Sequence, residues 1–262
     1  MLTSLQNPLV KQIRKLHKTQ ERHRENLHLL EGTNLLEVAS KVNYPLITVL
    51  TTQLWQKKNY SLWQTLQTQA QRLETVSGDV MKNLATTVNP DGVIATASRN
   101  ARSSSPPDNL KLGLVFDRIQ DPGNLGTIIR TSVAMNVDFI WLSDDSVDLD
   151  NPKVMRSSVG EWFKIQAKVE KDLVSLVKKY QSQGYQIVAT SLEGNKTHWE
   201  IDFTKPTILL LGNEAQGLSS ALASLATENV KIPLANDVES LNVAMATGFL
   251  LAEYQRQQTS EK

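Results

Sequence analysis

Short apolar segments alternate with helix-length stretches through the second half of the chain, and this alternation restricts the fold more than any other feature. We expect strands at five of these segments, residues 112–117, 138–143, 185–191, 207–212 and 230–234. Strands separated by helices need crossover connections, so they should form a largely parallel sheet in an α/β fold. Ligands bind such sheets beyond the carboxyl ends of the strands. We therefore expect the functional site in the loops that follow Asp117, Gly212 and Leu234.

A linker divides the chain into two domains. Residues 99–109 consist mainly of small and polar residues and contain Pro106-Pro107, which can neither continue a helix nor lie in a central strand. We predict one domain over residues 1–98 and a second over residues 110–262. The first contains two strand-like segments among helix-like stretches, which indicates a small α/β domain, at residues 46–52 and 92–97.

Composition excludes several kinds of chemistry. The chain contains no cysteine, which rules out disulfides, thiolate zinc sites, iron–sulfur clusters and cysteine nucleophiles and fits the reducing cytoplasm. No apolar segment reaches the roughly 18 residues that a membrane span needs, and no secretory signal is apparent. The histidines show no metal-binding spacing, and we expect all four at the surface, at His17, His23, His28 and His198.

Positive charge is concentrated near the amino terminus. Asn7-Pro8 predicts a helix start, with Asn7 as the N-cap and Pro8 in the first turn. Residues 11–24 carry a net charge of +5, whereas the rest of the chain sums to −4. The six basic residues of this segment are Lys11, Arg14, Lys15, Lys18, Arg22 and Arg24. A solvated helix face is the simplest interpretation, and contact with phosphates gains support only if the second domain acts on nucleic acid.

Three polar segments follow predicted strands, and the first is DRIQDPGNLGTIIRT, residues 117–131. A Pro-Gly turn leads into a helix that should begin near Asn124, with Arg130 about two turns further along. The segment has neither the spacing of a dinucleotide-binding fingerprint nor the Gly-Lys-Ser/Thr of a phosphate-binding loop. The alternative is an ordinary strand–turn–helix connection with an exposed arginine.

The other two polar segments contain residues that a structural role explains only in part. Gly212 ends an apolar strand and lets the backbone turn tightly or meet a ligand closely, and Glu214 next to it also suits the positive end of a following helix. In the last segment Ser240 is a natural N-cap for the apolar helix behind it. Capping does not explain Asn242, a poor helix former that needs polar partners if it is buried.

In the order and spacing of these segments the chain resembles the SpoU/TrmH branch of the SPOUT RNA methyltransferases. The resemblance runs from residue 112 to about residue 255, and residues 4–11, 30–32 and 89–93 resemble the RNA-binding extension of that family. It implies a parallel-sheet α/β domain with a deep trefoil knot, preceded by a small α/β domain that resembles a ribosomal-protein fold. It also implies S-adenosylmethionine as the cofactor, RNA as the partner, no metal, and a homodimer formed through the carboxyl-terminal domain.

The resemblance further implies roles for individual residues. The polar active-site set would be Asn124, Arg130, Glu214, Ser240 and Asn242. Backbone atoms would hold most of the cofactor, at Thr190, Gly212, Ile232 and Leu241. The six basic residues of segment 11–24 would contact RNA. Asn213 stands where relatives often have Ser or Ala, and Ala235-Asn236-Asp237 also varies the family pattern, which leaves the substrate nucleotide open.

The implied reaction is methylation of a ribose 2′-hydroxyl in structured RNA, ribosomal RNA rather than tRNA, and a guanosine is one candidate. The family gives the arginine at position 130 to the hydroxyl, either as base or as activator. A guanidinium with a pKa above about 12 is a poor base, which favours electrostatic activation of the hydroxyl. The alternatives are a tRNA 2′-O-methyltransferase, a base-methylating SPOUT enzyme and an RNA-binding module of this fold without turnover.

Overall fold

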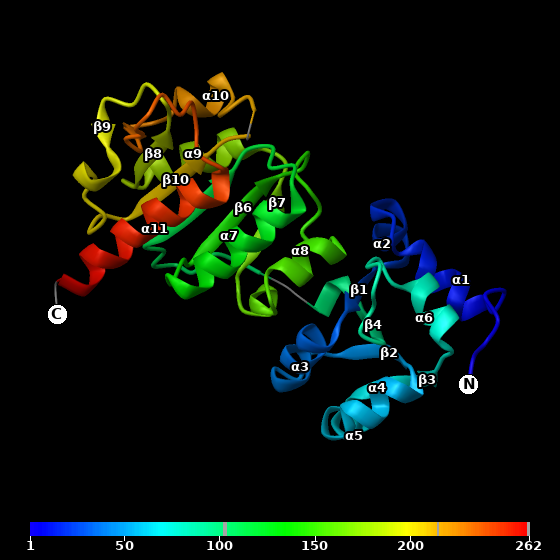
Figure 1. The fold of residues 1–262 in the computed structure, drawn as a ribbon. Coiled ribbons are helices and arrows are strands. Elements are labelled where there is room, and N and C mark those ends of the chain that lie inside the picture. The colour runs from blue at the N-terminus through cyan, green and yellow to red at the C-terminus, as the bar shows by residue number, and fades with distance from the viewer. Residues whose placement is uncertain (102–103, 214, 261–262) are drawn as a thin grey trace. The chain divides into compact units, whose positions relative to one another are not determined.

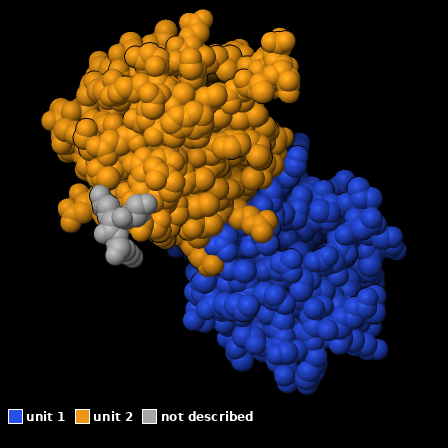
Figure 2. Space-filling model, turned by 60° about the vertical axis from the view of Figure 1, so that its left-hand side comes forward, with its two compact units in different colours: residues 1–103, 148–163 blue, residues 104–147, 164–262 orange. Residues whose placement is uncertain are grey.

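The computed structural model describes residues 1–101, 104–213 and 215–260, which form two compact units (Figures 1 and 2). Unit 1 comprises residues 1–103 and 148–163, and unit 2 comprises residues 104–147 and 164–262. Segment 148–163 therefore packs within unit 1, although it lies between two strands of unit 2 in the sequence. The linker composition indicates where the chain first leaves unit 1, but the composition of segment 148–163 gives no sign that this segment belongs to unit 1.

Unit 1 contains a four-stranded sheet in the order β1-β4-β2-β3. Its strands are β1 (Leu27–Glu31), β2 (Leu46–Thr51), β3 (Ala70–Thr75) and β4 (Val93–Ser98). Strand β4 pairs antiparallel with β1 and β2, and β2 pairs parallel with β3. The predictions of β2 and β4 are confirmed. The sequence did not predict β3, which is largely polar, or β1, in which a histidine and a glutamate interrupt the apolar pattern.

The helices of unit 1 are α1 (Pro8–Lys15), α2 (Thr19–Glu25), α3 (Thr33–Lys41), α4 (Gln53–Lys58), α5 (Tyr60–Gln69), α6 (Gly78–Leu84) and α8 (Pro152–Ser157). Helix α1 begins as predicted, because the side chain of Asn7 accepts the N–H of Leu9 at 2.9 Å and Pro8 is the first helical residue. The buried side of α1, with Val10 and Ile13, packs into one core with residues of α6.

Unit 2 contains a seven-stranded parallel sheet in the order β7-β6-β5-β10-β8-β11-β9. Its strands are β5 (Leu112–Phe116), β6 (Phe139–Ser143), β7 (Ala167–Glu170), β8 (Gln186–Thr190), β9 (Lys196–Thr197), β10 (Thr207–Leu211) and β11 (Glu228–Lys231). All five predicted strands are present in a parallel sheet, as expected. The two strands that were not predicted, β7 and β9, are short and lie at the sheet edges, where no apolar segment is needed.

Helices cover both faces of this sheet, which explains why the central strands are apolar throughout. In β10 the side chains of Ile208 and Leu210 join the core formed with α9 (Leu173–Ser182) and α10 (Ser220–Ala223). Leu209 and Leu211 point the other way, because side chains alternate along a strand. Helices α7 (Pro122–Ala134) and α11 (Val243–Ser260) pack side by side (Figure 1). Across the described ranges, no helix is both long and apolar enough to cross a membrane.

The strand order reverses at the boundary between β5 and β10. From β5 the chain moves outward through β6 and β7, and the later strands lie on the other side of β5, where β10 takes the place between β5 and the earlier strand β8. A parallel sheet opens a crevice at such a switch point, at the carboxyl ends of the strands. The loops after Asp117 and Gly212 lie at this point, as the sequence predicts.

Candidate functional site

Three of the four residues expected at the cofactor lie at the carboxyl ends of neighbouring strands. Thr190 ends β8, Gly212 follows β10 and Ile232 follows β11, and these three strands are adjacent and parallel. Neighbouring strands lie about 4.8 Å apart, so the three backbone segments meet at one edge of the sheet. The Thr190 hydroxyl donates to the Leu210 carbonyl at 3.3 Å, which leaves mainly backbone atoms of this residue for a ligand.

The segment after β10 turns back sharply on itself at Gly212. A Cβ atom on Gly212 would lie 2.1 Å from the carbonyl carbon of Gly217 and 2.2 Å from the nitrogen of Leu218, so only glycine fits. Asn213 and Gly217 exchange two backbone hydrogen bonds of 3.0 and 2.9 Å, which close the loop. Glu214 lies outside the described residues, and its neighbours on both sides belong to this closed loop.

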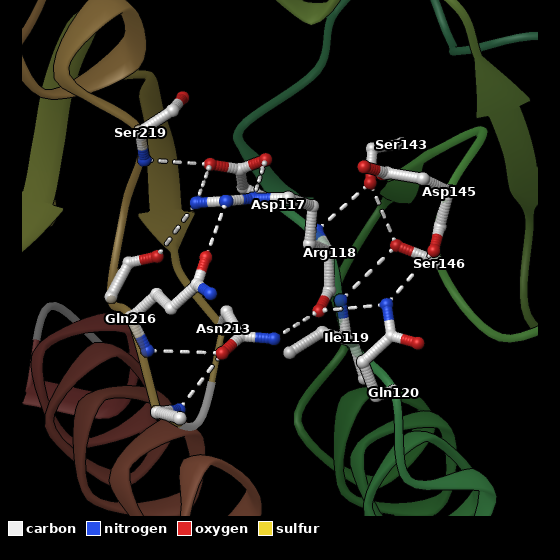
Figure 3. A network of polar contacts seen from close by, with 12 residues as sticks. Asp117, Arg118, Ile119, Gln120, Ser143, Asp145, Ser146, Asn213, Gln216 and Ser219 are labelled. Atoms are coloured by element: carbon white, nitrogen blue, oxygen red, sulfur yellow. Dashed lines mark hydrogen bonds and ion pairs between the residues drawn. The ribbon is translucent and has the colours of Figure 1, made fainter.

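The side chain of Asn213 holds the same loop from within (Figure 3). Its Oδ1 accepts the N–H groups of Ala215 at 2.9 Å and Gln216 at 3.0 Å. Its Nδ2 donates to the carbonyl oxygen of Arg118 at 2.8 Å. One asparagine therefore holds Ala215 and Gln216 and attaches them to the loop after β5.

Arg118 attaches the two loops a second time, through its guanidinium group. This group donates to Oε1 of Gln216 at 2.8 Å and to the carbonyl of Gly217 at 3.4 Å, and it pairs with Asp117 at 3.3 Å. The buried Asp117 carboxylate also accepts the N–H of Ser219 at 2.7 Å. Arg118 was not among the predicted site residues, because an arginine after a strand gives no sign of these contacts or of the left-handed backbone with φ 61° found here.

The first and last polar segments meet through two asparagines. Nδ2 of Asn242 donates to Oδ1 of Asn124 at 2.9 Å. Asn242 also caps α11, because its Oδ1 accepts the N–H groups of Ala244 at 2.9 Å and Met245 at 3.3 Å. The prediction of Ser240 as the N-cap is therefore wrong. Ser240 is exposed and lies outside the helix, and Asn242, two residues later, is the cap.

Helix α7 begins earlier than predicted and carries Arg130 on its exposed side. The Asp121 side chain caps the helix by accepting the N–H of Asn124 at 2.8 Å, so Pro122 and Gly123 are helical rather than a preceding turn. Arg130 is exposed, and no side chain of the described ranges bonds or pairs with its guanidinium. Six residues of helix separate Asn124 from Arg130, or about 9 Å along the axis.

The basic segment is two helices rather than one, with a break between α1 and α2. Lys11, Arg14, Lys15 and Lys18 are exposed. Arg24 is also exposed and pairs with Glu21 and Glu25.

Arg22 does not belong to the exposed set, which corrects the sequence interpretation. Its residue exposure is 0%, and its guanidinium donates to the carbonyl of Leu16 at 3.0 Å and to Asp148 at 2.5 Å. Burial raises the pKa of the Asp148 carboxyl, but Arg22 and Arg99 together lower it by more, so this pKa lies below its usual value. Arg22 is occupied inside unit 1 and is not available to a phosphate.

The expectation that all four histidines lie at the surface is also wrong. His28 is fully buried in β1, and His198 is buried and contacts the rings of Trp199 and Phe249, whose centroids lie 4.7 and 6.1 Å from its own. His17 is half-buried, and its Nε2 lies 2.8 Å from the carbonyl oxygen of Leu84. The described residues contain no cluster of acidic and histidine side chains that could hold a metal.

Comparison with known proteins links both units to RNA methyltransferases. A family model described as the SpoU rRNA Methylase family matches residues 111–252, and one described as an MRM3-like substrate binding domain matches residues 7–95. An uncharacterized tRNA/rRNA methyltransferase of Synechocystis is 48% identical over 98% of this chain and 94% of its own length.

Two further relatives carry more specific names. The 23S rRNA (guanosine(2553)-2′-O)-methyltransferase RlmP of Bacillus subtilis is 32% identical over 95% of this chain and 97% of its own length. The crystal structure of the SpoU methyltransferase AviRb from Streptomyces viridochromogenes, in complex with the cofactor AdoMet, superimposes with a TM-score of 0.86. That match is 28% identical and covers 97% of this chain and 99% of AviRb.

Proposed function

The chain belongs to the SpoU rRNA methylase family, and from this membership we propose that it methylates a ribose 2′-hydroxyl of ribosomal RNA with S-adenosylmethionine. The observation that supports this most directly is the hydrogen bond between Asn124 and Asn242, which joins two of the proposed catalytic segments. The Bacillus subtilis relative, by its name a guanosine 2′-O-methyltransferase of 23S rRNA, spans nearly the whole chain and makes a guanosine the first nucleotide to test.

The carboxyl ends of β10, β8 and β11 fit the proposed cofactor. Backbone atoms at Thr190, Gly212 and Ile232 would bind the polar parts of S-adenosylmethionine, and the half-buried side chains of Ile232 and Leu241 would contact its apolar surface. When bound, the sulfonium supplies a methyl group that needs no further activation. The protein then has to position the hydroxyl and stabilise the charge that develops on its oxygen.

We assign this second task to Arg130. Its guanidinium is exposed and has no partner in the described ranges, so its planar fork could bind a phosphate and the 2′-oxygen together. Asn124, at the start of the same helix, and Asn242 would shape the site beside it. Glu214 and Ser240 complete the proposed polar set. A guanidinium is a poor base, so Arg130 would stabilise the developing alkoxide, and the hydroxyl proton would pass to solvent water at this exposed position.

A substrate that lacks one atom tests the proposal. A ribosomal RNA fragment with a single 2′-deoxynucleotide at the modified position should accept no methyl group, because the attacking oxygen is absent while every base atom remains. The matched control is the same fragment with an intact ribose, which should be methylated. Methyl transfer to the deoxy substrate, found on the base by nucleoside mass spectrometry, would instead support a base methyltransferase.

Two alternatives differ from the proposal in measurable ways. A module without turnover would bind RNA and leave the intact fragment unmethylated at saturating S-adenosylmethionine. A tRNA enzyme would methylate tRNA and leave the ribosomal fragment unchanged. The near full-length match to the 23S rRNA relative favours ribosomal RNA.

The proposal includes a homodimer and a knotted carboxyl-terminal segment. Met245 and Phe249 lie four residues apart on α11 and are 57% and 45% exposed, and Trp199 nearby is 55% exposed. Trp199 and Phe249 both contact the ring of His198. Large apolar side chains gathered in this way suit a second copy of the chain. The knot rests on the family resemblance, and the return of β11 to a place beside β8 is compatible with it.

A further inference from the structure

Two residues beside the proposed catalytic loops have no role in the reaction described so far. Arg118 follows β5 and Asn213 follows β10, at the point where the strand order reverses. On the basis of the proposed methyl transfer, we infer that Arg118 and Asn213 are positioning residues, which hold the loop closed by Asn213 and Gly217 against the segment between β5 and α7.

Asn213 determines the shape of the loop after β10. The Asn213 side chain accepts two N–H groups from Ala215 and Gln216, while its backbone pairs with Gly217. Both amides belong to exposed residues, so without this side chain water would compete for them and the turn would lose its internal support. The backbone course of Ala215 and Gln216 therefore depends on the Asn213 side chain.

Arg118 attaches the loop to the rest of unit 2. The Arg118 carbonyl accepts Nδ2 of Asn213, and its guanidinium binds Gln216 and the carbonyl of Gly217 (Figure 3). Asp117 binds the N–H of Ser219, beyond the loop. Two consecutive residues after β5 therefore hold the loop at its beginning, middle and end.

The short segment between Arg118 and the proposed catalytic helix α7 is also held in place. The N–H of Arg118 donates to Oγ of Ser143 at 2.8 Å, and Val147 donates to the carbonyl of Ile119 at 2.7 Å, so the chain before α7 is itself held in place. Only Gln120 separates Ile119 from Asp121, the residue that caps α7. A shift at Arg118 would move the loop relative to Asn124.

The backbone of Arg118 indicates that this arrangement is imposed by its contacts. Its φ of 61° is a left-handed conformation that residues other than glycine seldom adopt. Such conformations persist where surrounding contacts determine them, and they cluster at functional sites. The Arg118 side chain is 28% exposed and bonded to protein groups, so it positions the loop rather than touching the substrate.

Arg118→Gly tests the inference, because glycine accepts this backbone conformation while the guanidinium is removed. We expect wild-type S-adenosylmethionine affinity by calorimetry, faster hydrogen exchange at the amides of Ala215 and Gln216, and a single-turnover methylation rate reduced by about ten- to a hundredfold. Arg118→Lys should recover part of the rate. Asn136→Gly is the matched control, since Asn136 is exposed, has φ 54°, and has no part in these contacts.

Asn213→Asp provides an independent variant. The carboxylate still accepts both loop amides but cannot donate to the Arg118 carbonyl, so we expect a reduced rate with smaller changes in exchange than in Arg118→Gly. Wild-type rates and exchange in both variants would overturn the inference, as would a loss of cofactor affinity or melting temperature as large as the loss of rate. If the wild-type protein does not methylate RNA, the proposed function fails, and the exchange measurement alone decides whether Arg118 holds the loop.

Discussion

At the scale of single residues, the sequence could not show which charged side chains are bonded to other groups of the protein. Arg22 and Lys18 look equivalent in the basic segment, yet Arg22 is buried against Asp148 and Lys18 is exposed. The partner is 126 residues away, in a segment whose return to unit 1 leaves no trace in local composition. By contrast, the cap at Asn7 and the apolar segments that form the central strands were predictable because their signals lie in neighbouring residues.

Arg130→Ala should separate catalysis from cofactor binding. The proposed role of the exposed Arg130 guanidinium is toward the ribose and not toward the cofactor, so we expect nearly unchanged cofactor affinity by calorimetry. Turnover should fall by about two to three orders of magnitude, as for the loss of a group that stabilises developing charge. Arg130→Lys should recover little, because lysine keeps the charge but lacks the planar fork. A variant with normal turnover would refute the assigned role.

Asp148→Asn should destabilise unit 1, because it leaves a buried guanidinium without its carboxylate. We expect a loss of about 3 kcal/mol in the free energy of unfolding, at the low end for such pairs because the amide can still accept one hydrogen bond. Urea unfolding followed by Trp fluorescence would measure it. Glu74→Gln in the exposed pair with Arg72 is the control, with an expected loss of at most about 1 kcal/mol.

The same substitution should change the pH dependence of stability. The folded-state pKa of Asp148 is lowered, so its contribution is present above the unfolded pKa of about 4 and is lost as pH falls toward the folded value. The difference in unfolding free energy between wild type and Asp148→Asn should therefore shrink below about pH 4. A difference that stays constant from pH 6 to pH 3 would contradict this assignment.

At the scale of elements, the helix boundaries of the site were predictable only approximately, because several residues could serve as caps. Ser240 and Asn242 both suit the start of α11, and the choice depends on Asn124, which lies in another helix. Likewise, Asp121 and Asn124 both suit the start of α7, and the observed cap places Pro122 in the first turn. The start of α11 thus involves a partner in another helix, whereas the start of α7 is set by a local bond between Asp121 and Asn124.

Substitutions at Asn242 should distinguish its two bonds. Asn242→Ala removes the cap of α11 and should cost about 1 kcal/mol of stability together with a loss of turnover. Asn242→Asp keeps the cap acceptor but cannot donate to Asn124, so stability should remain near wild type while turnover still falls. Thermal unfolding and single-turnover rates would measure both. Ser240→Ala is the control for capping, and a stability loss there equal to that of Asn242→Ala would contradict the observed cap.

At the scale of the whole molecule, α11 should form part of a homodimer interface. Val243, Leu250 and Tyr254 are buried within the chain itself, so the apolar surface of α11 left for a partner centres on Met245 and Phe249. Light scattering at micromolar concentration should give twice the mass of one chain. Phe249→Glu should shift the protein to monomers by burying an unpaired charge. A monomeric wild type would defeat the proposal.

The salt dependence of RNA binding should report how many basic residues of unit 1 contact phosphates. The sequence suggests six, but Arg22 is buried and Arg24 is paired with two carboxylates, which leaves Lys11, Arg14, Lys15 and Lys18. Four contacts predict a slope of log affinity against log salt concentration near −3 to −4. Each substitution by alanine among these four should reduce the slope by roughly one unit at most, whereas Arg24→Ala should change it less. Lys205→Ala, an exposed position of unit 2, is the control. If Lys11→Ala and Lys15→Ala leave both affinity and slope unchanged, RNA binds unit 1 elsewhere or not at all.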